Sequence, residues 1–243
     1  MLVYGIHPVA EALKAGRVTR LRVSARADRR MDQVLALAAR QGVAVERVDP
    51  AMLERASRGG VHQGVLADVE EPRDYSIAEL VSLPPRAAPL APLIVVLDGI
   101  EDPHNVGAIL RTCDAAGATG VIRQARHAAA LDGVVGKASA GALAHLPIAT
   151  VVNIARAIEE LKDANVWTIG LAGDAPDLHT AVDWTAPSAV VLGAEGTGLR
   201  RLVRERCDRL VRIPMLGHVD SLNVSVAAAV VLYEIVRQRS AAP

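Results

Sequence analysis

The chain has 243 residues with a formal net charge of zero, and 51% of them are hydrophobic, so it is a folded protein with one large domain or two smaller ones. It contains no Phe and only 2% aromatic residues, which nearly excludes binding of single-stranded RNA by stacking bases on aromatic rings. Two cysteines, no signal-peptide pattern and no apolar run of membrane-spanning length lead us to expect a cytoplasmic protein without a metal cluster.

In chain order, residues 1–70 read as a small α/β unit. The periodicity predicts helices over residues 7–15, 31–41 and 52–56 and strands over 21–23, 43–48 and 64–69. Residues 71–92 are rich in proline and read as a linker around one short helix at 76–81.

From residue 93 to the C-terminus, apolar strands alternate with helices. We expect strands over 93–97, 120–122, 166–171, 189–192 and 210–213, and helices over 105–116, 155–164, 199–205 and 222–237. Buried strands separated by helices predict a mainly parallel sheet, which binds ligands at the carboxyl ends of its strands. The loops after Leu97, Leu171, Leu192 and Ile213 are therefore the candidate site.

Basic residues gather in two runs despite the zero net charge. Seven lie between Lys14 and Arg30 against one acid, and six arginines lie between Arg200 and Arg212 against two acids. Such runs are typical of a surface that follows RNA phosphates, but they are also typical of ordinary solvated helix faces. The sequence leaves both interpretations open.

Three segments after predicted strands carry the candidate chemistry. In residues 98–113, Asn105 stands where a helix cap belongs, and Arg111 further along could clamp a phosphate or form a salt bridge. In residues 190–199, the spacing Gly193-x-x-Gly196-x-Gly198 is neither a dinucleotide fingerprint nor a P-loop, and Glu195 lies inside the turn.

The third segment, residues 213–226, begins Ile213-Pro214-Met215 and continues with Ser221-Leu222-Asn223-Val224-Ser225. Ser221 is a natural helix cap, and Asn223 would then lie in the first turn with unused donors and acceptors. A capped helix with no further role explains Ser221, but it explains Asn223 less well.

Together the three segments resemble the signature motifs of the SpoU/TrmH ribose methyltransferases. The patterns Asn-x-Gly-x-x-x-Arg, Gly-x-Glu-Gly-x-Gly and Ile-Pro-Met followed by Ser-Leu-Asn-Val-Ser occur in order. Residues 1–70 are similar to the RNA-binding domain of that family, which has an L30e-like fold. Residues 4–9 and 62–65 look most like the branch that methylates a guanosine of large-subunit (23S) rRNA.

The resemblance implies a SPOUT α/β catalytic domain with a C-terminal trefoil knot, a homodimer, and S-adenosylmethionine as the methyl donor. It implies that the donor is held by Gly193, Gly196, Ile213, Met215 and Leu222. It also implies that the reaction centre is lined by Asn105, Arg111, Glu195, Ser221 and Asn223.

A ribose 2′-hydroxyl is a poor nucleophile, so the enzyme must hold it in line with the methyl group and supply a proton acceptor. Because an arginine is effectively always protonated, we interpret Arg111 as a phosphate clamp rather than as a base. Three alternatives remain: the same reaction on tRNA, a catalytically silent RNA-binding or ribosome-assembly factor, and a nucleotide-dependent oxidoreductase. The five intact reaction-centre residues disfavour the silent factor, and the missing dinucleotide fingerprint disfavours the oxidoreductase.

Overall fold

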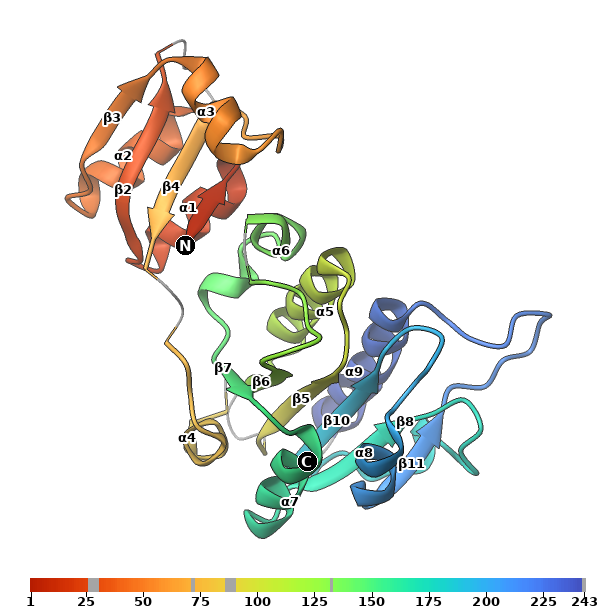
Figure 1. Cartoon of the computed structure of the whole chain (residues 1–243). Coiled ribbons are helices and arrows are strands. Elements are labelled where there is room, and N and C mark those ends of the chain that lie inside the picture. Colours follow the sequence, from red (N-terminus) through yellow and green to blue (C-terminus); the bar gives the residue numbers. More distant parts are fainter. Residues whose placement is uncertain (26–30, 71–72, 86–90, 132, 242–243) are drawn as a thin grey trace. The chain divides into compact units, whose positions relative to one another are not determined.

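A computed structural model describes residues 1–25, 31–70, 73–85, 91–131 and 133–241 of the chain. These residues form two compact units (Figure 1). The first unit contains residues 1–72 with the short segments 106–111 and 130–145, and the second contains residues 73–105, 112–129 and 146–243.

The first unit is built on a four-stranded mixed sheet of order β1-β4-β2-β3. Strand β4 pairs antiparallel with β1 and with β2, while β2 and β3 run parallel. Its elements are β1 (Leu2–Tyr4), α1 (Ile6–Lys14), β2 (Val18–Ser24), α2 (Asp32–Arg40), β3 (Val45–Val48), α3 (Pro50–Ser57) and β4 (Val65–Val69). The sequence predicted every one of these except β1, whose three residues are too few to show an alternating pattern.

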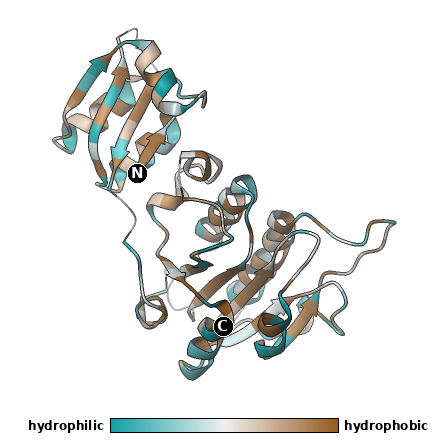
Figure 2. Ribbon diagram, viewed as in Figure 1, coloured by the Kyte–Doolittle hydropathy of each residue, from teal (hydrophilic) through white to brown (hydrophobic). Residues whose placement is uncertain are grey.

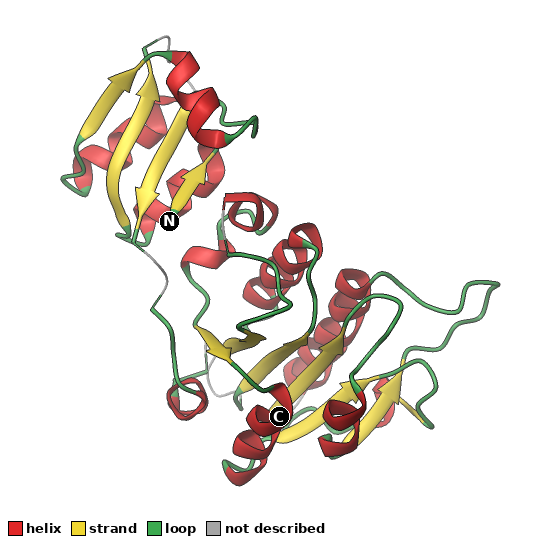
Figure 3. Cartoon of the chain, in the orientation of Figure 1, coloured by secondary structure: helices red, strands yellow, loops and turns green. Residues whose placement is uncertain are grey.

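The second unit is built on a seven-stranded sheet of order β7-β6-β5-β10-β8-β11-β9, and every pairing is parallel (Figure 3). This confirms the predicted α/β class. The strands are β5 (Leu93–Asp98), β6 (Gly120–Gln124), β7 (Ile148–Val151), β8 (Trp167–Leu171), β9 (Asp177–Leu178), β10 (Ser188–Gly193) and β11 (Arg209–Arg212). Its helices are α4 (Ile77–Ser82), α5 (Pro103–Ala115), α7 (Ile154–Asp163), α8 (Arg201–Arg206) and α9 (Val224–Ala241), with a single 3-10 turn at His179–Ala181. Residues 106–111 of α5, helix α6 (Gly133–Ala138) and the 3-10 turn at Ala142–Ala144 group with the first unit.

The central strands β5 and β10 are hydrophobic over Leu93–Leu97 and Ala189–Leu192 because both faces of the sheet are covered there (Figure 2). On one face, Ile94 and Val96 of β5 belong to an apolar core that also includes residues of α4, α7 and α8. Since side chains alternate along a strand, Val95 and Leu97 point to the opposite face. Helix α9 packs against β10.

Two helix starts differ from the sequence prediction. Helix α5 begins two residues earlier than expected because Asp102 is its cap, accepting a hydrogen bond from the His104 N–H, and Pro103 occupies the first helical position. Helix α9 begins at Val224, so the predicted cap Ser221 is wrong. Asn105 is likewise not a cap, which leaves its side chain available for other contacts. Helix α6 and strands β7 and β9, all short, were not predicted.

A buried arginine anchors the last helix. Arg239 is 7% exposed and donates to the carbonyl oxygens of Ala91, Trp184 and Ala186, and at 3.4 Å to that of Pro92. Its cationic head is therefore satisfied by backbone oxygens from two distant segments. Within the described ranges, no helix has the length and apolar character that crossing a membrane requires.

Candidate active site

Two of the three predicted segments meet at the carboxyl edge of the large sheet. Strands β5 and β10 are neighbours, and Asp98 at the end of β5 lies opposite Gly193 at the end of β10. The loops after these two strands therefore leave the sheet side by side, as the parallel topology predicts.

The glycines of the second segment are required by the backbone. A Cβ atom on Gly193 would lie 2.2 Å from the carbonyl carbon of Gly198, so the loop folds directly back onto the end of β10. Gly196 and Gly198 have φ angles of 76° and 67°, which a side chain disfavours. A hydrogen bond from the Gly198 N–H to the Ala194 oxygen closes the turn at 2.9 Å. This tight turn places Glu195 at its exposed rim.

Asn223 joins all three segments. Its Oδ1 accepts hydrogen bonds from the Ser225 N–H (2.9 Å), from the Ser225 hydroxyl (2.6 Å) and, at 3.4 Å, from the Val226 N–H, so Asn223 caps α9. Because these donors fix the amide orientation, Nδ2 must point the other way. It donates to Asn105 Oδ1 at 3.0 Å and to Glu195 Oε1 at 2.5 Å. Three of the predicted reaction-centre residues are thus in direct contact.

Asn105 is left with an unused donor. Since its Oδ1 faces Asn223, its Nδ2 is the free end of the amide, and that group has no hydrogen-bond partner within the described parts of the chain. The residue is 6% exposed. This nitrogen is not one of the fully enclosed atoms that lack a partner, so it keeps solvent contact and is available to a ligand in the adjoining cavity.

Two cavities adjoin this cluster. The first has a volume of about 490 Å³ and the second about 470 Å³, both within the range of small-molecule sites. They share one wall, formed by Ala194, Glu195, Thr197 and Gly198. Ser221 and Asn223 line the first cavity, Asn105 lines the second, and Glu195 lines both.

All five residues predicted to hold the methyl donor line the first cavity: Gly193, Gly196, Ile213, Met215 and Leu222. The carboxylates of Asp174, Glu195 and Asp220 also line it, and hydrogen bonding from Arg204 lowers the pKa of Asp174. A wall of backbone groups and carboxylates suits a ligand with an aromatic base and a cationic sulfonium group. The residues present therefore fit S-adenosylmethionine.

Arg111 has a different environment from Asn105, Glu195 and Asn223, which contact one another. It lies on α5 six residues after Asn105, which places it about 9 Å further along the helix axis and about 120° around it. Its side chain is exposed, has no acceptor within the described parts of the chain, and lines neither cavity. Its guanidinium is free to bind an anion from solution.

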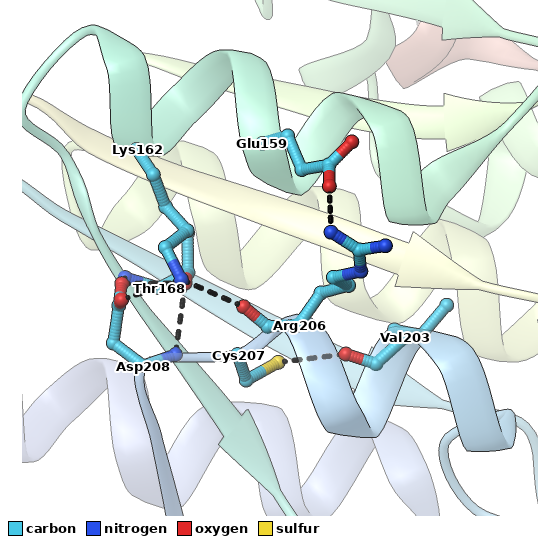
Figure 4. Close-up of polar contacts among 7 residues, drawn as sticks. All are labelled: Glu159, Lys162, Thr168, Val203, Arg206, Cys207 and Asp208. Atoms are coloured by element: carbon cyan, nitrogen blue, oxygen red, sulfur yellow. Dashed lines mark hydrogen bonds and ion pairs between the residues drawn. The ribbon is translucent and has the colours of Figure 1, made fainter.

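The basic runs are largely occupied by partners within the protein. In the second run, five of the six arginines pair with carboxylates, and Arg212 donates to the carbonyls of Ala175 and Pro176. Figure 4 shows how Arg206 reaches Glu159 of α7 while Lys162 bonds to Asp208. For this run the structure favours solvated, paired helix faces over a phosphate surface.

The first run is paired in the same way where it is described. Lys14 pairs with Glu11, Arg20 with Glu46 and Arg22 with Asp68, and Arg17 donates to the Glu70 oxygen. Arg26, Arg29 and Arg30 lie outside the described residues.

The two N-terminal segments that resemble the rRNA branch lie side by side in the first unit. The Ile6 N–H donates to Gln63 Oε1 at 2.9 Å, and the Gly5 N–H donates to the Val65 oxygen at 3.3 Å. His62 Nε2 lies 3.3 Å from Glu54 Oε2. The segments 4–9 and 62–65 are thus joined by hydrogen bonds within the small domain.

Sequence reasoning missed one polar pair at the site, Asp98 and Arg200. Asp98 is fully buried, and it accepts from the Arg200 N–H at 2.9 Å and from Arg200 Nε at 2.7 Å. Both residues line the second cavity. The signal was a lone aspartate that ends the apolar run of residues 93–97. Within the described parts of the chain, no cluster of three potential metal ligands occurs.

Comparison with known proteins adds independent findings to this geometry. The model of the SpoU rRNA Methylase family matches residues 92–233, and the model for RNA 2′-O ribose methyltransferase substrate binding matches residues 2–75. Both matches together span most of the chain.

Individual relatives match over nearly the full length. The chain is 42% identical to 23S rRNA (guanosine-2′-O-)-methyltransferase RlmB of Yersinia pestis, covering 98% of this chain and 97% of that one. It is 45% identical to the RlmB protein of Pseudomonas putida, covering 98% and 96%. Among solved structures, the SpoU methyltransferase AviRb of Streptomyces viridochromogenes in complex with AdoMet has a TM-score of 0.83 at 28% identity, covering 100% of this chain and 91% of that one.

Proposed function

Because this chain belongs to the SpoU rRNA methylase family, we infer that it transfers a methyl group from S-adenosylmethionine to the 2′-oxygen of a guanosine ribose in 23S ribosomal RNA. The relatives that carry this activity in their names match the chain from end to end, including its RNA-binding part. The protein is therefore an enzyme, an rRNA guanosine-2′-O-methyltransferase.

One structural observation carries this function in geometric terms. A donor-sized cavity and a second cavity of similar size share the wall that contains Glu195, and Asn223 ties that wall to Asn105. Two reactants that occupy the two cavities meet at this wall. Such an arrangement lowers the entropic cost of bringing a hydroxyl to a methyl group.

The residues that line the two cavities have different roles in the reaction. Gly193, Gly196, Ile213, Met215 and Leu222 hold the donor, which supplies an electrophilic methyl group on a sulfonium sulfur. The carboxylate of Glu195 faces both cavities and complements the positive charge, while Ser221 and Asn223 fix the position of the reacting groups. With the donor bound, a ribose 2′-oxygen in the second cavity would meet its methyl group at the wall formed by Ala194, Glu195, Thr197 and Gly198.

Arg111 acts as a clamp for an RNA phosphate. Its side chain is exposed and has no acceptor within the described ranges, so no ion pair must be broken before an RNA phosphate binds. A guanidinium stays protonated at neutral pH, so Arg111 positions the RNA for the reaction and does not itself take the hydroxyl proton.

Three further assignments belong to the same proposal. Residues 1–70 form the RNA-binding domain, residues 71–92 the linker and residues 93–243 the catalytic domain with the trefoil knot. The protein is a homodimer, because α9 keeps an exposed apolar face. The protein resides in the cytoplasm, and its two free cysteines support this location because reduced thiols are typical of that compartment. Burial raises the pKa of both thiols, that of Cys207 to about 12.

The experiment that tests the function is a map of ribose methylation in 23S rRNA from a strain lacking this protein. Primer extension at low nucleotide concentration stops at 2′-O-methylated residues. We expect one stop at a guanosine to disappear in the deletion strain and to return when the wild-type chain is expressed. An unchanged 23S map, or a loss confined to tRNA, would contradict the proposal.

A further inference from the structure

Arg200 is held so that one edge of its guanidinium remains open. A guanidinium presents two edges with paired donors, Nε with Nη2 and Nη1 with Nη2. Asp98 occupies the first edge, accepting from Nε at 2.7 Å and forming an ion pair with Nη2. Nη1 has no acceptor in the part of the chain that the structure describes. The second edge therefore offers two parallel N–H donors.

Arg200 and Asp98 both belong to the wall of the second cavity. Arg200 lines that cavity, and its side chain is 49% exposed whereas Asp98 is fully buried. The backbone N–H of Arg200 also donates to Asp98 Oδ2, which fixes the base of the side chain as well as its head. The unpartnered amide of Asn105, 6% exposed, lines the same cavity. Two residues with unpartnered N–H donors, Arg200 and Asn105, thus line this cavity.

The charges of the cavity argue against a phosphate as that ligand. Asp98 neutralises Arg200, and Glu101, Asp102 and Glu195 add three carboxylates to the lining, with His127 at the rim. A phosphate would be repelled here, whereas an uncharged group with adjacent acceptors would not. Two adjacent acceptors are what the O6 and N7 atoms of guanine present; cytosine presents such a pair only as O2 and N3, and the relatives named for their substrate methylate a guanosine. Adenine has an amino group beside N7, and pyrimidines lack N7.

We propose that the second cavity receives the base of the target nucleotide and that Arg200, positioned by Asp98, selects guanine through its O6 and N7 atoms. This inference rests on the proposed function, because the base must lie beside the shared wall at which its ribose meets the methyl donor. Arg200 is then a specificity-determining residue, and Asp98 is a positioning residue that acts through it.

The direct test changes the RNA and leaves the protein intact. After the target guanosine has been mapped, ligated fragments of the rRNA would carry guanosine, 7-deazaguanosine, inosine or adenosine at that position. Inosine keeps O6 and N7, so we expect a kcat/KM close to that for guanosine. We expect 7-deazaguanosine, which lacks N7, to lower kcat/KM between about 5-fold and about 150-fold, and adenosine to lower it at least as much.

Protein variants supply the second arm. Arg200→Lys offers a single point charge, so the preference for guanosine over 7-deazaguanosine should shrink to within about 2-fold. Asp98→Asn should also reduce that preference, which a merely structural residue would not do. The matched control is Arg201→Ala, whose arginine pairs with Glu205 outside the cavity and whose loss should leave the preference unchanged.

The outcomes separate this inference from the proposed function. Equal methylation of guanosine and 7-deazaguanosine RNA by the wild-type chain would overturn the role of Arg200 while leaving the function intact. Loss of activity with inosine but not with 7-deazaguanosine would also overturn it, because the base would then be recognised through its 2-amino group. Failure to methylate the guanosine RNA at all would overturn both.

Discussion

Asn223 donates a hydrogen bond from its side-chain amide to Asn105, a residue 118 positions earlier in the chain. The same amide nitrogen also donates to Glu195, and the amide oxygen caps the last helix. The start of α9 and the catalytic cluster are therefore fixed by one side chain. A substitution of Asn223 that keeps the helix cap but removes the N–H donor to Asn105 and Glu195 therefore separates its role in the helix from its role in the site.

Asn223→Asp is that change. Aspartate caps a helix as well as asparagine, but it cannot donate to Asn105 and it places a second carboxylate against Glu195. We expect methylation to fall by about 100-fold or more, because misplacing a positioning group by about 1 Å can have that effect, while Tm changes little. The control Ser225→Ala removes only the hydroxyl contact to Asn223 and should keep near-normal activity. Turnover of Asn223→Asp within 3-fold of the wild type would show that the bridge is dispensable.

The sequence predicted the parallel sheet and the meeting of the three segments because both follow from local patterns. It misplaced the cap of α5, although Asp102 followed by Pro103 is a recognisable helix start, because Asn105 also suits a cap. It could not predict that five of the six arginines between residues 200 and 212 are paired with carboxylates. Their partners, such as Asp174 for Arg204 and Glu159 for Arg206, are brought close only by the tertiary fold.

Arg111 should be needed for turnover and not for binding of the methyl donor, because it lines neither cavity. We expect Arg111→Ala to lower the methylation rate by orders of magnitude, and Arg111→Lys to restore little, since a point charge does not reproduce a two-pronged contact with a phosphate. Calorimetry should give an unchanged Kd for S-adenosylmethionine. If saturating RNA restores the rate of Arg111→Ala, then Arg111 only docks the RNA.

Helix α9 should carry a subunit interface. Val226, Val230 and Tyr233 lie on one face of the helix and are 49%, 37% and 53% exposed, which is unusual for neighbouring apolar residues. We expect a dimer by light scattering, and we expect Val230→Asp to shift it toward the monomer. Val152→Asp is the control, because Val152 is an 83% exposed residue away from α9. A stable wild-type monomer at micromolar concentration would refute the interface.

Arg239→Met should destabilise the protein without touching the site. The substitution leaves the carbonyls of Ala91, Trp184 and Ala186 without their donor, a loss of about 2–4 kcal/mol in the free energy of unfolding. For a chain of this size that is a fall in Tm of roughly 5–15 °C. Arg156→Met, which removes an exposed helix-surface ion pair with Glu160, should change stability by less than about 1 kcal/mol. Equal losses in the free energy of unfolding for the two variants would mean that the buried contacts of Arg239 stabilise the protein no more than a surface ion pair does.

The most direct test of the whole account is methylation by the purified full-length chain of 23S rRNA isolated from the deletion strain. With labelled S-adenosylmethionine as the only methyl source, nuclease digestion and mass spectrometry identify the modified nucleoside. We predict 2′-O-methylguanosine at one position, approaching one methyl group per rRNA molecule, and none with the Asn223→Asp variant in the same time. A base-methylated product, a different nucleoside, or label in tRNA but not in 23S rRNA would contradict the account.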